Sequence, residues 1–107
     1  MEKEQILDKL SNMPAFELDK MKDKKLLELK DVLKQYHIAR DNECEARFKK
    51  REKLVSEGNS YNKAEQILRV DKDLHELKRK VMYLSSLKND IKLCIEMINN
   101  YYWKNKT

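Results

Sequence analysis

The chain contains one proline, Pro14, and one glycine, Gly58, and so has little of the material from which turns are made. Sandwiches and barrels of β-strands need turn residues about every 8–12 positions, so an all-β fold is excluded. An α/β fold with a glycine-rich phosphate loop is excluded for the same reason. Charged residues make up 40% of the chain, and Lys, Leu and Glu, which favour helices, are the commonest residues. The composition therefore predicts one all-α domain over residues 1–107.

The same two residues divide the chain into helical segments. Pro14 interrupts the first apolar stretch, because proline lacks an N–H donor and disfavours helical backbone just before it. Asp23 is a suitable N-cap for a long helix, and Gly58 marks the turn that ends it. The expected segments are a short N-terminal helix with its connector (1–22), a long helix (23–55), a turn (56–60) and a second long helix (61–103). Two long helices joined by a short turn predict an antiparallel helical hairpin.

Apolar residues recur with heptad spacing along the second long helix. From residue 67 to residue 102, steps of three and four residues alternate, and Lys88 is the one position in this series that is not apolar. Such alternation is typical of coiled-coil packing. Because two helices alone bury little volume, we expect this heptad seam to pack the hairpin and to join copies of the chain into an oligomer. The heptad seam consists of Ile67, Val70, Leu74, Leu77, Val81, Leu84, Ile91, Ile95 and Ile98.

Apolar spacing fails midway along the first long helix. Its register would place Arg40 and Glu43 at core positions, where charged side chains are costly without partners. This stretch is therefore frayed, rotated onto another face, or exposed for a function. It contains the densest group of cations in the chain, here called the basic cluster: Arg47, Lys49, Lys50, Arg51 and Lys53. Lys63 and Arg69 lie close enough to the turn to extend it.

The net charge of +5 is unevenly divided, with −3 over residues 1–19 and +8 over residues 20–107. A basic body favours polyanions or an acidic protein surface. Cations interleaved with an aromatic ring suit single strands, because phosphates bind cations and bases stack on rings. For the basic cluster, a nucleic-acid site and a solvated face with ion pairs one turn apart both stay open. For Phe48, a core position and a stacking position both stay open.

Residues able to support catalysis are sparse. His37 and His75 lie far apart without an HExxH motif, and alternate residues such as Asp71, Asp73 and His75 would point around a helix. Cys44 lies between two glutamates, which works against a thiolate nucleophile. We therefore expect neither an enzyme nor a bound metal or cofactor.

Two widely spaced cysteines, Cys44 and Cys94, predict free thiols in a reducing compartment. No apolar run approaches the roughly 18 residues that a membrane span needs. Residues 1–20 lack the apolar core of a signal peptide. We expect a soluble, cytoplasmic protein.

The chain resembles the bacteriophage recombination mediators over about residues 24–103. In that family a basic helix precedes a short glycine-containing turn, and Y-x-K-x-E and D-x-D motifs then open a long amphipathic helix. The same order stands here in Lys49-Lys50-Arg51, Gly58, Tyr61-x-Lys63-x-Glu65 and Asp71-x-Asp73. One departure is that Leu54-Val55 stands where the family tends to carry an aromatic pair.

The resemblance implies a non-catalytic accessory protein that binds single-stranded DNA and helps to load a RecA-like recombinase. It implies three kinds of partner besides copies of the chain: single-stranded DNA or RNA, a recombinase, and a single-stranded-DNA-binding protein. It also implies DNA-contacting cations just before the turn, which match Lys50 and Arg51, and the cytoplasm of a bacterium or phage-infected cell. The alternative is a coiled-coil adaptor or inhibitor that docks on an acidic protein and never contacts nucleic acid.

Overall fold

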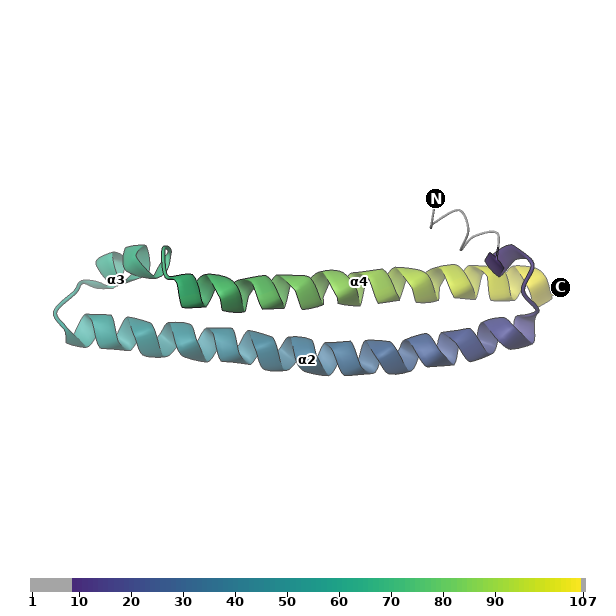
Figure 1. Ribbon diagram of the computed structural model, residues 1–107, viewed down its shortest axis with the longest axis horizontal. Coiled ribbons are helices and arrows are strands. Elements are labelled where there is room, and N and C mark those ends of the chain that lie inside the picture. Colours follow the sequence, from purple (N-terminus) through teal and green to yellow (C-terminus); the bar gives the residue numbers. More distant parts are fainter. Residues whose placement is uncertain (1–8, 107) are drawn as a thin grey trace. The chain divides into compact units, whose positions relative to one another are not determined.

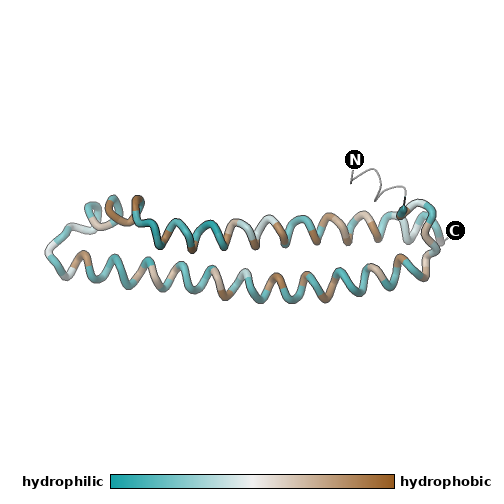
Figure 2. Tube along the Cα trace, in the orientation of Figure 1, coloured by the Kyte–Doolittle hydropathy of each residue, from teal (hydrophilic) through white to brown (hydrophobic). Residues whose placement is uncertain are grey.

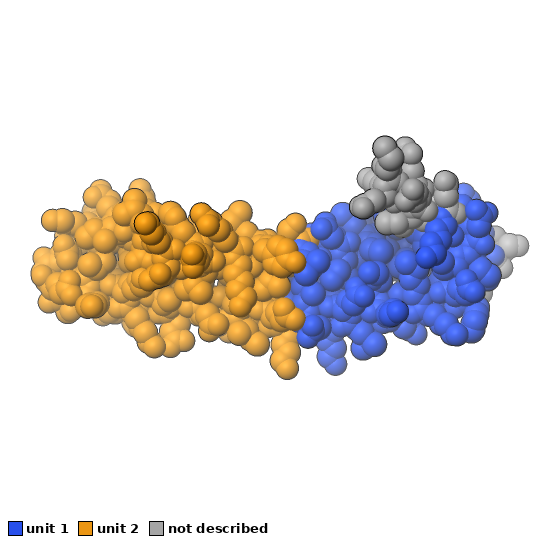
Figure 3. Space-filling model, viewed as in Figure 1, with its two compact units in different colours: residues 1–32, 87–107 blue, residues 33–86 orange. Residues whose placement is uncertain are grey.

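A computed structural model describes residues 9–106, and within them it contains helices and connecting turns but no strand. A helical turn at residues 9–11 precedes α2 (Ala15–Ser56), α3 (Tyr61–Leu68) and α4 (Lys72–Lys106) (Figure 1). The chain divides into two compact units: unit 1 comprises residues up to 32 and from 87 onward, and unit 2 comprises residues 33–86 (Figure 3). In each unit a stretch of α2 lies beside a stretch of α4 that runs in the opposite direction, so the predicted all-α hairpin is confirmed.

Helix α2 begins at Ala15, earlier than the expected start at Asp23. The backbone N–H groups of Glu17 and Leu18 donate to the carbonyl oxygen of Pro14 at 3.0 and 3.1 Å. Proline fits the start of a helix, because the N–H that it lacks would have no partner there. Pro14 therefore opens the long helix, and the connector expected to reach residue 22 ends at this proline. Of the short N-terminal helix, residues 1–8 lie outside the described part of the chain.

The turn between α2 and α3 falls at the single glycine. Gly58 has a φ of 98°, a left-handed backbone that side chains with a Cβ rarely adopt. Asn59 closes the turn, because its backbone N–H and its side-chain amide both donate to the carbonyl oxygen of Leu54, at 3.2 and 2.9 Å. Ser60 then caps α3 by accepting the backbone N–H of Lys63 at 3.2 Å.

A break at residues 69–71 divides the helix that the sequence predicts over 61–103. Asp71 causes the new start, since its carboxylate accepts the backbone N–H of Leu74 at 3.0 Å and so caps α4. Asp73 adds a negative charge in the first turn of α4, where the helix dipole favours it. An aspartate followed by an acidic first turn is an N-cap signal that the continuous heptad pattern conceals.

The break shifts the apolar face of the heptad seam. On α3 the buried side chains are Ala64 and Leu68, whereas Val70 at the break is 74% exposed. From Leu74 onward the heptad seam lies in the core of the hairpin, where Leu74, Leu84, Ile91 and Ile98 are buried within the chain. Figure 2 shows the apolar positions of α4 recurring between hydrophilic ones. The heptad seam therefore packs the hairpin from Leu74 onward, and its first two positions lie outside the core.

The core of unit 1 joins three segments through Leu10, Leu18 and Ile98, all of them fully buried. The side-chain amide of Asn105 donates to the backbone carbonyl oxygens of Leu10 and Met13, at 3.2 and 2.9 Å. These two hydrogen bonds hold the turn before Pro14 against the last turns of α4. The buried side chains of unit 2 are Ala39, Ala64, Leu68, Leu74 and Leu84. Among the described helices, none is both long enough and apolar enough to cross a membrane.

Candidate nucleic-acid interface

The last turns of α2 carry the basic cluster, and the structure divides its cations between two directions. Because successive residues of a helix point about 100° apart, five cations in seven positions cannot share one face. Lys50 and Arg51 face α3 and the start of α4, and their side chains are 33% and 23% exposed. Arg47, Lys49 and Lys53 are exposed to solvent.

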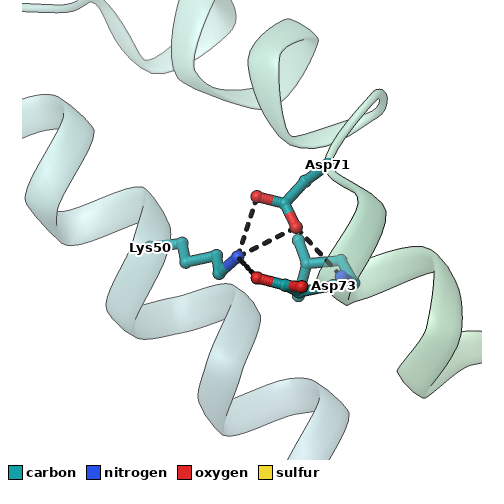
Figure 4. Close-up of polar contacts among 4 residues, drawn as sticks. Lys50, Asp71 and Asp73 are labelled. Atoms are coloured by element: carbon teal, nitrogen blue, oxygen red, sulfur yellow. Dashed lines mark hydrogen bonds and ion pairs between the residues drawn. The ribbon is translucent and has the colours of Figure 1, made fainter.

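Lys50 lies between two carboxylates at the break before α4 (Figure 4). Its Nζ lies 2.9 Å from Oδ1 and 2.8 Å from Oδ2 of Asp71, and 3.3 Å from Oδ2 of Asp73. The hydrogen bond to Asp71 raises the pKa of Lys50, and the bond to Asp73 adds to the effect. The pKa of Asp71 is lowered, first by Lys50 and then by the backbone N–H of Leu74. The charge of Lys50 is thus countered inside unit 2.

Arg51 makes a second contact from α2, and this one reaches α3. Its Nη1 donates to Glu65 Oε1 at 3.1 Å and to Tyr61 Oη at 3.2 Å. The hydrogen bond to Glu65 raises the pKa of Arg51. The guanidinium carbon also lies 5.2 Å from the centre of the Tyr61 ring and 5.8 Å from the centre of the Phe48 ring. Arg51 therefore contacts two aromatic rings as well as a carboxylate.

Both rings that contact Arg51 are open to solvent. Phe48 is 54% exposed and Tyr61 is 59% exposed. The interpretation of Phe48 as a core residue is therefore wrong, because its helix turns this position away from the packed face. Exposed aromatic rings next to a cation offer flat surfaces on which a base or another ring can stack.

The motifs on which the family resemblance rests meet the two inward cations. Tyr61 and Glu65 of the first motif contact Arg51, and both aspartates of the second motif contact Lys50. Lys63, the middle residue of the first motif, is exposed. The spacing of these motifs thus has a structural reason, since it ties α3 and the start of α4 to α2.

The remaining cations of the basic cluster lie in solvent. Lys49 pairs with Glu45 one turn earlier, at 2.8 Å, and their hydrogen bond raises the pKa of Lys49 and lowers that of Glu45. Both side chains are largely exposed, so water and salt weaken this pair. Arg47 and Lys53 make no ion pair with any of the residues that the structure describes.

An open groove of about 630 Å³ lies between the end of α2 and α3. We call it the arginine groove, and it is lined by Arg47, Arg51, Tyr61, Asn62, Glu65, Gln66 and Arg69. The guanidinium groups of Arg47 and Arg69 form no ion pair or hydrogen bond within residues 9–106. Sequence reasoning placed Arg69 near the basic cluster but missed Asn62 and Gln66, because amides on a short helix carry no distinctive pattern.

Residues with catalytic potential lie elsewhere and apart. His75 Nε2 lies 2.6 Å from the backbone carbonyl oxygen of Arg69, and His37 packs edge-on against Tyr36. Cys44 and Cys94 are free thiols in different units. Residues 9–106 contain no group of three or more His, Cys, Asp or Glu side chains that could hold a metal ion.

The described surface of unit 2 thus places exposed aromatic rings beside an open groove lined by arginines. When protein-family models, curated proteins and solved structures are compared with the chain, none of them matches it significantly.

Proposed function

We propose that the protein binds single-stranded nucleic acid without catalysing a reaction. The observation that carries this proposal is the stack of Phe48, Arg51 and Tyr61, with both rings exposed, beside Arg47 and Arg69, which form no ion pair with any described residue. Cations attract the phosphate backbone, and the exposed rings offer stacking surfaces to unpaired bases. Bases inside a duplex are already stacked on each other, so this combination favours a single strand.

Phosphate contacts in this proposal come from the exposed cations near the end of α2. These are Arg47, Lys49, Lys53 and Lys63, and their contacts are sequence-tolerant because every nucleotide carries the same phosphate. Lys50 instead positions the surface, since Asp71 and Asp73 already counter its charge.

A role as an accessory protein of recombination, which helps to load a RecA-like recombinase, extends the proposal. It is supported by the resemblance to the bacteriophage recombination mediators. Four of the residues that carry the resemblance hold Lys50 and Arg51 in place, namely Tyr61, Glu65, Asp71 and Asp73. A recombinase and a single-stranded-DNA-binding protein would then be its protein partners.

Fluorescence anisotropy of a labelled oligothymidylate, measured over a range of salt concentrations, tests the proposal. We expect tight binding at low salt. A plot of the logarithm of the binding constant against the logarithm of the salt concentration should have a slope of about −0.7 for each phosphate contact. The double variant Lys49→Gln/Lys53→Gln should flatten this slope more than Lys78→Gln/Lys80→Gln, which removes the same charge from α4. Absence of binding at low salt would refute the proposal.

A second candidate is a coiled-coil adaptor or inhibitor that docks on an acidic protein surface without contacting nucleic acid. It is favoured by Met82 and Tyr83, two large side chains exposed on α4 one residue beyond the cations Lys78, Arg79 and Lys80. Polyglutamate separates the two candidates, because it carries negative charge but no bases. If polyglutamate displaces oligothymidylate at equal charge concentration, the bases contribute nothing and the adaptor is favoured.

A further inference from the structure

We propose that the arginine groove is a binding site for one nucleotide unit. The phosphate lies between Arg47 and Arg69, and the base stacks on the exposed ring of Tyr61. This inference rests on the proposed function and adds to it a defined place, a stoichiometry and the residues that hold each part of the ligand.

Two rows of side chains form the walls of the groove, and within each row neighbouring residues stand one helical turn apart. Arg47 and Arg51 stand four residues apart on α2, and Tyr61, Glu65 and Arg69 follow the same spacing along α3 and its cap. Residues four apart share one face of a helix, so each row presents its side chains to the groove together. The link between Arg51 and Glu65 at 3.1 Å joins the two walls.

The charges in the groove leave a place for an anion. Glu65 is matched by Arg51, so Arg47 and Arg69 supply two positive charges that no described carboxylate counters. Planar guanidinium groups bind phosphate oxygens through two parallel hydrogen bonds, which a lysine cannot do. Two such groups at an open groove form a cradle for one phosphodiester.

Tyr61 is held in position before any ligand arrives. Arg51 donates to its Oη at 3.2 Å and lies 5.2 Å from the centre of its ring, yet the residue remains 59% exposed. A ring that is already fixed loses little conformational freedom when a base stacks on it, which favours binding. The amides of Asn62 and Gln66, one turn apart on the same wall, provide donors and acceptors for a base edge.

The size of the groove agrees with this ligand. Its volume of about 630 Å³ falls within the roughly 300–1,000 Å³ of sites that hold small molecules. A nucleotide unit of a strand and a free nucleotide share the same phosphate and base, so both sources are included in the experiment.

The phosphate contact is tested with Arg69→Gln, and with Arg79→Gln as its matched control. Arg79 is an exposed arginine on α4 in the same unit and lies outside the groove. Arg69→Gln should reduce the salt slope of oligothymidylate binding by about 0.7, the value for one lost phosphate contact. Arg79→Gln should leave the slope unchanged.

The base contact is tested with Tyr61→Ala, and with Tyr83→Ala as control, since both tyrosines are exposed in unit 2. Tyr61→Ala should weaken oligothymidylate binding by about 5- to 150-fold, the range for one lost base stack. It should have no such effect on an abasic oligonucleotide, and Tyr61→Phe should bind oligothymidylate nearly as well as the natural protein. Circular dichroism of each variant verifies that its helices are intact.

The outcomes distinguish the site from the function. If the natural protein binds oligothymidylate but Arg69→Gln and Tyr61→Ala behave like their controls, the groove is not the site and the proposed function stands. If the natural protein does not bind oligothymidylate at low salt, the proposed function itself fails. Displacement of the oligonucleotide by an equal concentration of thymidine monophosphate would support the groove and assign it to free nucleotides.

Discussion

The Nζ atom of Lys50 lies 2.9 and 2.8 Å from the two carboxylate oxygens of Asp71, so a cation of α2 holds the residue that directly precedes α4. The same aspartate accepts the backbone N–H of Leu74 and caps α4. One side chain thus ends the continuity of a helix and anchors the new helix to its neighbour. This double role explains why the Asp71-x-Asp73 motif faces the basic cluster of α2.

The two roles of Asp71 can be separated by substitution. Asp71→Asn removes the charge that pairs with Lys50 but keeps an oxygen able to cap α4, whereas Asp71→Ala removes both. We expect the melting temperature to fall in the order natural protein, Asp71→Asn, Asp71→Ala, as measured by circular dichroism. Glu76→Gln, which removes a charge from an exposed position on α4, serves as the control and should melt like the natural protein. Equal melting of all four proteins would show that neither the ion pair of Asp71 with Lys50 nor the cap on α4 forms in solution.

The pairing of Asp71 with Lys50 also makes stability depend on pH in a defined direction. Because the pKa of Asp71 is lowered in the folded protein, the unfolded chain binds the proton more readily. The stabilisation is therefore complete above the ordinary aspartate pKa of about 4, and it is lost as the pH falls through the lowered value. The difference in melting temperature between the natural protein and Asp71→Asn should be largest near neutral pH and should shrink below about pH 4. A difference that stays constant down to strong acid would contradict this cause.

Gly58→Ala tests the left-handed turn. An added Cβ would meet no atom within 4 Å, so the cost comes from the backbone, with φ at 98°, and not from a clash. We expect the free energy of unfolding to fall by about 1–2 kcal/mol, and less for Gly58→Asn, because asparagine tolerates left-handed backbone better. Glu57→Ala, one residue earlier, should change it by less than about 0.5 kcal/mol. Chemical denaturation measures all three, and an unaffected Gly58→Ala would exclude this turn conformation.

Leu74→Ala and Val70→Ala test the break between α3 and α4. A continuous heptad seam would bury both residues, but Leu74 is 3% exposed and Val70 is 74% exposed. Leu74→Ala should lower the free energy of unfolding by about 2–5 kcal/mol, as for other buried leucines, and Val70→Ala by less than about 0.5 kcal/mol. A large loss in both variants would mean that Val70 is covered in solution, either by an unbroken helix or by another copy of the chain.

The expected oligomer stays a prediction, and the structure changes which residues it would use. Leu74, Leu84, Ile91 and Ile98 of the heptad seam are buried within one chain and are not available to a second copy. Sedimentation of the natural protein at several concentrations measures the association directly.

Sequence and structure contributed differently to the candidate site. The composition and the single glycine were sufficient to predict helical structure and the position of its turn, because local backbone preferences decide both. The basic cluster was likewise visible as a run of cations. The sequence did not show that the cations of the basic cluster point in two directions, because the direction of Lys50 and Arg51 depends on carboxylates that lie on α3 and at the start of α4.

The sequence by itself determined an all-α hairpin that turns at Gly58 and carries its densest positive charge just before that turn. Helix propensity, heptad spacing and the absence of a Cβ are properties of neighbouring residues, so they can be read in order along the chain. Only the tertiary structure decided that Pro14 opens α2, that Asp71 starts a new helix, and that Arg47 and Arg69 share a groove. These outcomes depend on contacts between residues distant in sequence, or on competition between two local structures that the tertiary contacts resolve.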